Sequence, residues 1–489
     1  MQTPSPYPLV LVTGPTGYVG GRLLAALEAN GVHVRCLARR PEALRGRVGA
    51  CTEIAAGDIR DPERLAAAMS GVGVAYYLVH SMGSTGAFAD EDRRLAKAFA
   101  DAARAAGVAR IVYLGGLGSG NALSDHLASR QEVGRVLAAS GVSTVEFRAG
   151  IVIGSGSLAF DAMRALVRQL PIMIVPRWVG TLTQPIAIDD VVDYLAAAAQ
   201  LDRQLAGVYE IGGPERLSYG GLMTEYARQR GWRRTIIPVP VLSPWLSSLW
   251  LGLVTPVYAR VARKMIDGLR NETIVRDDRA RREFPEITPR GVRRAIAEAT
   301  LERHDAPTRW SDAVSSAGGW AERVTTPGKL LTDERVRWVA APPERAFAPI
   351  LRIGGRTGWY YGDRLWELRG WLDTAVGGVG IRRGRRHPSQ LSPGDTIDFW
   401  RVESIEPGRR LRLRAEMKLP GTAWLEFAVA PRGSGSEIRQ TACFAPSGIW
   451  GRAYWYAVAP FHRVLFPKML AQIAGAIPAD ADTAGRVGR

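Results

Sequence analysis

Short apolar runs alternate with amphipathic helical stretches through residues 8–154 of the chain. Each apolar run is long enough for one buried strand, and each stretch between two runs is long enough for a crossover helix. The alternation predicts an α/β fold with a doubly wound parallel sheet. Strands are predicted at 8–13, 32–38, 53–61, 72–83, 108–118 and 141–154, with helices after the first strand and at 61–70, 87–106 and 127–140.

A glycine-rich turn, GPTGYVG, follows the first predicted strand and leads into the helical stretch GRLLAALEANG. In a dinucleotide-binding turn the first glycine permits the tight bend, the second admits the pyrophosphate, and the third lets helix and strand pack closely. The positive end of the helix faces the phosphates. We therefore expect a dinucleotide to bind at Gly14, Thr16, Gly17, Tyr18, Val19 and Gly20.

The residues after the second predicted strand indicate which dinucleotide is preferred. An acidic residue here would hold the ribose hydroxyls of NAD(H), but the strand is followed by Arg39 and Arg40. A guanidinium binds a 2′-phosphate through paired hydrogen bonds. The sequence therefore favours NADP(H), with NAD(H) as the alternative cofactor. The competing interpretation is that both arginines merely lie in a surface loop.

Two further strand ends are expected to touch the cofactor. The third predicted strand ends in Asp58 and Ile59, in position to contact the adenine. The fourth ends in Val79 and His80, which should pass beneath the nicotinamide. Because the carboxyl ends of parallel strands meet at one edge of the sheet, all these residues are expected around one crevice.

These motifs, in this order along the chain, carry a family resemblance: Thr13–Gly20, Asp58, YYLVHSM, IVYLGGLG, RQEVGRVLAASGV, QPIAIDDVVDYLAAAA and GVYEIGGPERLSYGGLMTEYARQRG. Residues 8–300 resemble the atypical and extended short-chain dehydrogenase/reductases, on the NmrA-like side of that group. The resemblance implies a Rossmann domain with a smaller C-terminal lobe, which binds NAD(P).

The sequence departs from that superfamily at the positions of its catalytic residues. Active members of that superfamily use a serine, a tyrosine and a lysine four residues after the tyrosine. Here Gly116 stands near the expected serine, while His126 and Arg130 occupy the other two positions. His126 could exchange a proton, and Arg130 could hold a ribose or phosphate oxygen. The alternative is an ordinary first helical turn, capped by Ser124 or Asp125, whose His126 and Arg130 face water.

A different pattern begins after a polar, Gly/Ser/Thr-rich stretch at 301–330, which is predicted to be a linker. Residues 334–355 are typical of a strand and a helix, and 395–417 of a hairpin whose second arm alternates apolar and charged positions. Two more strands and an aromatic terminal helix at 451–477 follow. This helix is predicted to break or kink at Pro460 or Pro467.

Strand, helix, antiparallel meander and terminal helix resemble a START-like (SRPBCC) helix-grip domain over 331–477. The resemblance implies an α+β domain with a hydrophobic cavity. A domain of this kind after an atypical dehydrogenase domain resembles a bacterial family of uncharacterised function. Tryptophans either line a pocket for a flat or lipidic ligand or fill a core; they stand at 338, 359, 366, 371, 400, 424, 450 and 455.

The charge balance changes this picture little. The chain carries 64 basic and 47 acidic residues, a formal charge of +17, but the basic residues are spread along it. The densest run, RRGRRH at 382–387, lies in no nucleic-acid motif, so no nucleic-acid partner is expected. Three cysteines without metal-ligand spacing predict no metal site and fit a reducing cytoplasm.

One stretch, 235–259, carries no charge and is long enough to span a bilayer. Its four prolines would break a lipid-exposed helix, so a buried lobe or pocket wall is the first interpretation. Contact with a membrane surface is the second, and a true span is the third.

Two functions remain open at this point. The first is an NADP(H)-dependent oxidoreductase that acts on a hydrophobic small molecule, with His126 or an ordered water as the proton donor. The second is a non-catalytic redox sensor or assembly factor that reads the nucleotide and binds a lipid or quinone. The resemblance to NmrA-like sensors, and to the accessory Rossmann subunit of respiratory complex I, supports the second.

Overall fold

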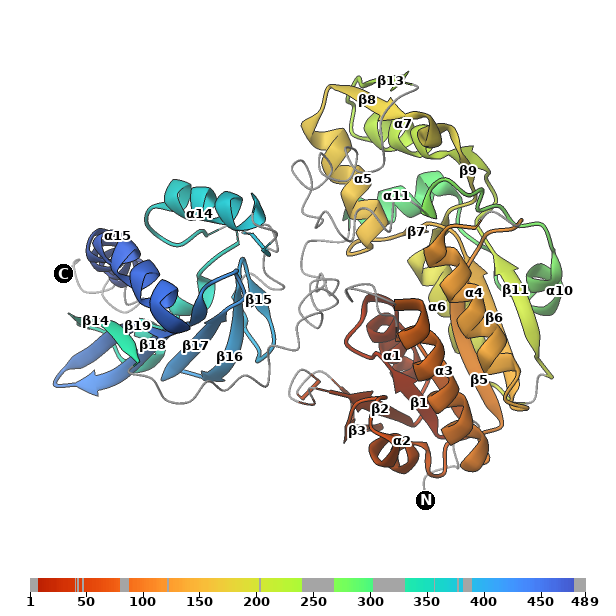
Figure 1. Ribbon diagram of the computed structural model, residues 1–489, viewed down its shortest axis with the longest axis horizontal. Helices are drawn as coiled ribbons and strands as arrows, with labels where there is room; N and C mark the ends of the chain where they lie inside the picture. Colours follow the sequence, from red (N-terminus) through yellow and green to blue (C-terminus); the bar gives the residue numbers. More distant parts are fainter. Residues whose placement is uncertain are drawn as a thin grey trace, which may run out of the picture. The chain divides into compact units, whose positions relative to one another are not determined.

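Two compact units, Met1–Ala317 and Gly318–Arg489, make up the chain in the computed structural model (Figure 1). Most of 235–259 and of the predicted linker falls outside the described residues, so the predicted domain boundaries stay predictions. The residues that the structure describes are 8–39, 41, 44–45, 48–79, 88–120, 123–201, 204–239, 268–301, 330–355, 357–375, 378–380 and 389–478.

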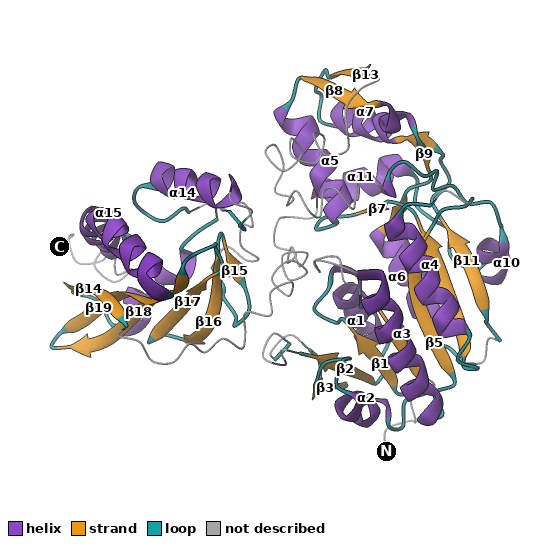
Figure 2. Cartoon of the chain, viewed as in Figure 1, coloured by secondary structure: helices purple, strands orange, loops and turns teal. Residues whose placement is uncertain are grey.

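A parallel sheet of seven strands forms the centre of the first unit, in the order β11-β6-β5-β4-β1-β2-β3 (Figure 2). The predicted doubly wound sheet is confirmed, because the strand order reverses beside β1, which lies between β2 and β4. The strands are β1 Val10–Thr13, β2 Val34–Ala38, β3 Thr52–Ala56, β4 Val74–Tyr77, β5 Arg110–Gly116, β6 Ser143–Ala149 and β11 Gly207–Ile211.

Both faces of this sheet are buried, as a parallel sheet requires. Val10 and Val12 point into a core that contains α1 and α6, whereas Leu11 points into a second core with α2, α3 and α4. The continuous apolar runs of the central strands β1 and β4 thus follow from burial on both sides. The helices are α1 Tyr18–Ala29, α2 Pro62–Met69, α3 Phe88–Ala105, α4 Asp125–Ala138 and α6 Ile188–Ala197.

Two predicted strands are wrong at their ends. The third was expected to reach residue 61, but β3 stops at Ala56 because Asp61 caps α2, accepting hydrogen bonds from the backbone of Glu63 and Arg64 at 3.1 Å. The sixth was expected to reach residue 154, but β6 stops at Ala149. Past β6 the error comes from apolar residues that continue beyond the strand, whereas the residues past β3, GDIRD, are mostly polar.

A smaller lobe follows β6 and packs around its own core of Phe160, Val167, Leu222, Tyr226 and Ile296. Its two-stranded sheets pair β7 with β10, β8 with β13, and β9 with β12. The elements are β7 Val152–Ile153, α5 Leu158–Gln169, β8 Ile172–Pro176, η2 Arg177–Gly180, β9 Leu182–Thr183, β10 Ile186–Ala187, β12 Leu217–Ser218, α7 Tyr219–Gln229, β13 Thr235–Val239 and α11 Val292–Leu301. The short helix α10 Arg279–Glu283 packs instead beside β11 of the large sheet.

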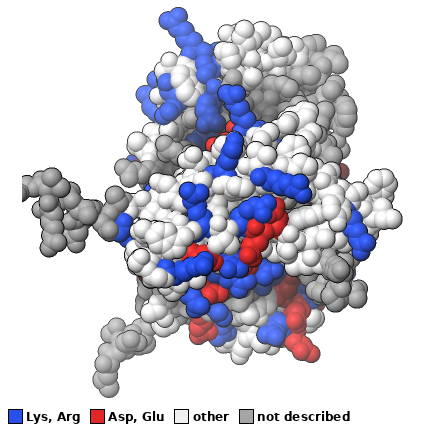
Figure 3. Space-filling model, turned by 90° about the vertical axis from the view of Figure 1, so that its left-hand side faces the viewer, with Lys and Arg blue, Asp and Glu red and all other residues white. Residues whose placement is uncertain are grey.

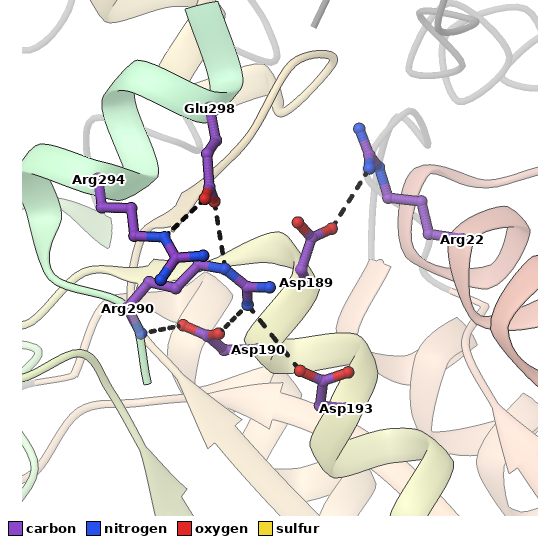
Figure 4. A network of polar contacts seen from close by, with 7 residues as sticks. All are labelled: Arg22, Asp189, Asp190, Asp193, Arg290, Arg294 and Glu298. Atoms are coloured by element: carbon purple, nitrogen blue, oxygen red, sulfur yellow. Dashed lines mark hydrogen bonds and ion pairs between the residues drawn. The ribbon is translucent and has the colours of Figure 1, made fainter. Parts of the chain in front are cut away.

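A charged cluster ties this lobe to the sheet (Figure 4). Asp190 on α6 is 1% exposed; it pairs with the guanidinium of Arg290 and accepts a hydrogen bond from its backbone nitrogen at 2.7 Å. Arg290 Nε also lies 3.2 Å from a carboxylate oxygen of Glu298 on α11. Burial raises the pKa of Asp190, although Arg290 opposes the shift. Removing one partner would leave a buried charge alone, so the pair fixes the lobe.

The second unit is built on an antiparallel sheet in the order β14-β19-β18-β17-β16-β15. The predicted alternation is confirmed in β17, where Leu411 and Leu413 are fully buried and the arginines between them are not. The strands are β14 Leu331–Val339, β15 Thr396–Ile397, β16 Trp400–Glu406, β17 Arg410–Ala415, β18 Gly421–Arg432 and β19 Gly435–Pro446.

Helices of the second unit pack on this sheet, and two of them differ from expectation. They are α13 Pro343–Phe347, the short η3 Ile350–Arg352, α14 Asp363–Ala375 and α15 Gly448–Gly475. The terminal helix α15 continues through Pro460 and Pro467, so a break is wrong, while a kink at these prolines stays a prediction. Its C-terminal half buries Leu465, Phe466, Met469, Leu470 and Ile473 in the core. Helix α14 was not predicted.

Within the ranges that the structure describes, no helix is long and apolar enough to cross a membrane. Of the uncharged stretch, only β13 falls in those ranges. It pairs with β8 in parallel register, and Ile237 is 44% exposed.

Two glycines of α15 give a test of its packing. A methyl group on Gly451 would overlap the carbonyl oxygen of Pro420 and lie 2.9 Å from Cα of Pro446. One on Gly475 would meet no described atom within 4 Å. Alanine normally stabilises a helical position by about 1 kcal/mol. We expect G475A to be neutral or stabilising and G451A to lower the free energy of unfolding by about 2 kcal/mol in urea titrations. Equal effects would contradict this packing.

Candidate functional site

The glycine turn after β1 has the geometry of a dinucleotide cradle. Gly14 has φ +70°, which an L side chain rarely adopts, and a methyl group there would lie 2.8 Å from the carbonyl oxygen of Leu78. The backbone nitrogen of Gly17 donates to the Gly14 carbonyl at 2.9 Å. A methyl group on Gly20 would overlap that same carbonyl. Only glycine at positions 14 and 20 therefore lets α1 start this close to the sheet.

The N-terminus of α1 is open toward this turn. Its capping residue is Gly17, which supplies no side-chain hydrogen bond to the first helical N–H groups. Those donors and the positive end of the helix dipole are suited to an anion. Thr16, Tyr18 and Val19 are half-buried around them. The six predicted residues of the turn are thus together in one place; their contact with a nucleotide stays a prediction.

Arg39 follows the carboxyl end of β2 directly and is exposed. It is therefore accessible from the sheet edge at which the glycine turn also lies, since β1 and β2 are paired and parallel. Arg40 lies outside the described residues. The arrangement agrees with a 2′-phosphate site, whose occupancy stays a prediction.

The two residues expected at the adenine have different surroundings. Asp58 is half-buried and accepts a hydrogen bond from the backbone nitrogen of Arg60 at 3.0 Å. Ile59 is 5% exposed and packs in the hydrophobic core with Leu37 and Leu65. Of this pair, Asp58 is the one with accessible atoms.

The end of β4 lies beside the glycine turn. The hydroxyl of Thr13 donates to the Tyr76 carbonyl at 2.8 Å and accepts from the Leu78 nitrogen at 3.2 Å, which fixes the two strand ends together. Val79 follows and is half-buried. His80 lies outside the described residues, so its placement beneath the nicotinamide stays a prediction.

His126 and Arg130 are both half-buried on the first turns of α4. Ser124 caps this helix, its hydroxyl accepting from the Leu127 nitrogen at 3.3 Å. The guanidinium of Arg130 donates to the carbonyl of Leu114 in β5. The alternative in which Arg130 faces water is therefore wrong, whereas the capping by Ser124 is confirmed. The side chain lies against the carboxyl end of β5.

Leu127 fills the space that a side chain at the end of β5 would take, and Arg130 lies beside it. A methyl group on Gly116 would overlap Leu127 Cδ2 at 2.7 Å and would make ordinary contacts with Arg130, 3.5 Å from Cδ and 3.7 Å from Nε. That Nε is buried and has no hydrogen-bond partner among the described residues. It is thus a donor directed at the strand end. Ser119, the next serine along the chain, is exposed.

Tyr113, on β5, cannot replace the missing tyrosine. It is 5% exposed, its hydroxyl donates to the backbone carbonyl of Arg130 at 3.0 Å, and burial raises its pKa to about 12. A phenol in this state holds its proton near neutral pH. The hydroxyl serves to fix α4 on the sheet.

A titratable group that the sequence did not reveal lies in the first turn of α5 and binds the loop between β7 and α5. Burial raises the pKa of Asp161 to about 6, and its carboxylate accepts from the Gly156 nitrogen at 3.2 Å. This loop contacts α1: Arg22 donates to the Ser155 carbonyl at 3.4 Å and lies 3.6 Å from Asp189 (Figure 4). A single aspartate at a helix start gives no sequence signal, because its burial depends on the lobe.

The structure places tryptophans of the second unit both in the core and on the surface, and the pocket that the sequence left open stays a prediction. Trp359, Trp366 and Trp400 lie in the core, where Trp359 and Trp366 have ring centroids 5.3 Å apart. For these three the core interpretation is confirmed. Trp371 and Trp450 are instead 54% and 79% exposed.

Several buried polar atoms of this core lack partners among the described residues. Gln440 on β19 is fully buried, yet neither its amide oxygen nor its amide nitrogen makes a hydrogen bond. The indole nitrogens of Trp366 and Trp400 are in the same state. A buried polar group without a partner costs about 1–3 kcal/mol. Such groups are therefore expected to meet a ligand or water.

Two families match the chain. Residues 14–149 match a family described as NAD(P)H-binding, and residues 325–469 match one described as "Protein of unknown function (DUF2867)". The cofactor of the first unit is therefore NAD(P)H, in agreement with the glycine turn.

Known proteins resemble parts of the chain. "Sterol demethylase protein B" of Methylococcus capsulatus is 34% identical over 120 residues; the match takes in 22% of this chain and only 34% of that relative's length. A structure of Escherichia coli NADPH-dependent quinone oxidoreductase with NADPH is 18% identical and has a TM-score of 0.48, covering 60% of this chain and 99% of that one. Citrobacter sp. triphenylmethane reductase with NADP(H) is 15% identical, with a TM-score of 0.49 and coverages of 60% and 100%.

The raised pKa of Asp161 predicts a pH dependence of stability. The folded protein binds this proton more tightly than the unfolded chain, so the free energy of unfolding should fall as pH rises from about 4 to about 6. D161N should remove roughly 2 kcal/mol of this decline in urea titrations. The exposed Asp101 on α3 serves as a control, since D101N should leave the decline in place. An unchanged profile in D161N would show that the carboxyl titrates elsewhere.

Proposed function

We propose that the chain is an NADP(H)-dependent oxidoreductase that acts on a hydrophobic small molecule. The observation that carries the proposal is the open N-terminus of α1 behind Gly14 and Gly20, with Arg39 exposed at the adjacent strand end. The helix start receives the diphosphate, and the guanidinium binds the 2′-phosphate.

The bound nicotinamide supplies or accepts the hydride. The chain must then hold and move a proton at the substrate oxygen. His126 is the group proposed for that role, because imidazole exchanges a proton near neutral pH. Arg130 cannot give up its proton, but its Nε can donate a hydrogen bond to a ribose or substrate oxygen at the end of β5.

The second unit is proposed to be a START-like helix-grip domain that binds the hydrophobic molecule. Its strand order and the terminal helix α15 across the sheet support this fold. The Gln440 amide, which has no partner among the described residues, supports a ligand with a carbonyl or hydroxyl group. The sterol in the name of the curated relative is consistent with this substrate class.

A second function, a non-catalytic NADP(H) sensor that binds a lipid or quinone, is supported by one observation. The phenol of Tyr113 at β5 is tied to the helix backbone, and no tyrosine or lysine occupies α4. The nucleotide would then be bound but not turned over.

The cofactor preference is tested by calorimetric titration with NADPH and NADH. We expect NADPH to bind more tightly, and R39E to weaken NADPH binding about tenfold or more while leaving NADH nearly unchanged. The exposed Arg104 on α3 is the control: R104E should change neither affinity. G20A should weaken both dinucleotides, because α1 can no longer approach the Gly14 carbonyl. Equal affinities of the unaltered protein would remove the role of Arg39, and no heat from either would overturn the proposal.

Catalysis is tested with a panel of quinones and hydrophobic ketones. H126A should lower kcat about 100-fold without changing NADPH affinity, since the hydride donor is untouched and only the proton donor is lost. The exposed His33, replaced in H33A, should leave turnover unchanged. Full turnover in H126A would dismiss the proton role. Tight NADPH binding with no turnover on the panel would favour the sensor.

A further inference from the structure

Helix α15 is apolar on two sides. Its C-terminal half buries one face in the core, while a second face leaves large hydrophobic side chains in solvent. A helix that packs on a sheet normally turns polar residues outward. Here Trp450, Phe461 and Val464 are 79%, 56% and 54% exposed, and the spacings of 11 and 3 residues place them on one stripe. Ile449 and Tyr456 extend it at 79% and 67%.

Helix α14 adds a second stripe beside the first. Leu365, Leu368 and Leu372 follow a helical spacing and are 43%, 53% and 47% exposed, as is Trp371 at 54%. The two helices touch where an Arg369 nitrogen donates to the Tyr454 hydroxyl at 2.8 Å. Among the described residues, half of the exposed large hydrophobic side chains lie on these two helices. An apolar surface of this extent marks an interaction site.

The charges of α15 indicate the chemistry of its partner. The helix contains Arg452, Arg463 and Lys468 and has no aspartate or glutamate in its 28 residues. Lys468 follows Val464 on the apolar stripe, whereas Arg452 and Arg463 are exposed on the flank of Ile449 and Tyr456, about half a turn from Trp450 and Phe461. Figure 3, which faces the side of Figure 1 where the second unit is drawn, shows broad uncharged areas with basic side chains and fewer acidic ones among them. The surface therefore suits an apolar partner with negative charge at its rim.

We propose that the outer face of α14 and α15, defined by Leu365, Leu368, Trp371, Leu372, Ile449, Trp450, Tyr456, Phe461 and Val464, docks on an anionic lipid bilayer. The aromatic and aliphatic side chains enter the boundary between headgroups and acyl chains, where tryptophan is favoured. The three cations of α15 pair with the negative headgroups. This proposal does not depend on the cofactor site, which lies in the first unit.

A second copy of the chain fits this face less well. Two α15 helices laid against each other would bring six cations together, and like charges repel. The exposed carboxylates of the face, Asp363 and Glu367, lie on α14 together with Arg364 and do not offset them. A bilayer containing anionic lipids supplies the missing negative charge.

Co-sedimentation of the full chain with vesicles tests the proposal. We expect binding to vesicles of equal parts phosphatidylcholine and phosphatidylserine, weaker binding at high salt, and little binding to phosphatidylcholine alone. The double variant W450S/F461S should reduce the partition coefficient about tenfold. Both side chains are exposed, so its melting temperature and NADPH affinity should match those of the unaltered protein. R452E/R463E should lose the preference for phosphatidylserine.

A matched control uses exposed isoleucines of the first unit. Ile172 and Ile174 on β8 are 59% and 55% exposed, and I172S/I174S should leave vesicle binding unchanged. Loss of binding in this variant alone would move the membrane contact to the β8–β13 region and overturn the proposal. Absence of binding to either vesicle would also overturn it. A concentration-dependent dimer that W450S/F461S disperses, without vesicle binding, would assign the face to a second copy.

Discussion

The close approach of α1 to the end of β1 is the contact on which the first unit depends. The carbonyl of Gly14 lies where a Cβ atom of residue 20 would be, and the same carbonyl accepts from the Gly17 nitrogen. Two glycines and one backbone hydrogen bond thus set the position of the helix start. The other proposed cofactor residues, Arg39, Asp58 and Val79, lie at the same edge of the sheet as this helix start, because each follows the carboxyl end of a parallel strand.

The sequence predicts this part well because it rests on local rules. Apolar runs buried on both sides, glycines at fixed spacing and helices between strands are readable without tertiary contacts. The six predicted strands exist, and the turn has the expected form. The C-terminal ends of strands were predicted less accurately than their existence. Apolar residues continue past β6, and past β3 the first clear boundary in the sequence is Asp61, which caps α2.

Features that depend on residues far apart in the chain could not be read in advance. The fold-back of Arg130 onto Leu114 requires the position of α4 over β5, and the burial of Asp161 requires the smaller lobe. Helix α14 escaped prediction because its apolar residues face both the core and solvent, which blurs the helical period. The strands of the second unit were predicted because apolar and polar residues alternate along them, a pattern that can be read without tertiary contacts.

The two prolines inside α15 limit how deeply the proposed docking face of α14 and α15 can enter a bilayer. Each proline lacks an N–H group, so the carbonyls of Tyr456 and Arg463, four residues before Pro460 and Pro467, have no intrahelical donor. Both of these residues are exposed. A carbonyl without a donor is tolerated in water or among headgroups but is expensive in hydrocarbon. The helix can therefore rest only at the wet boundary of a bilayer, an attachment shallow enough for the chain to leave again.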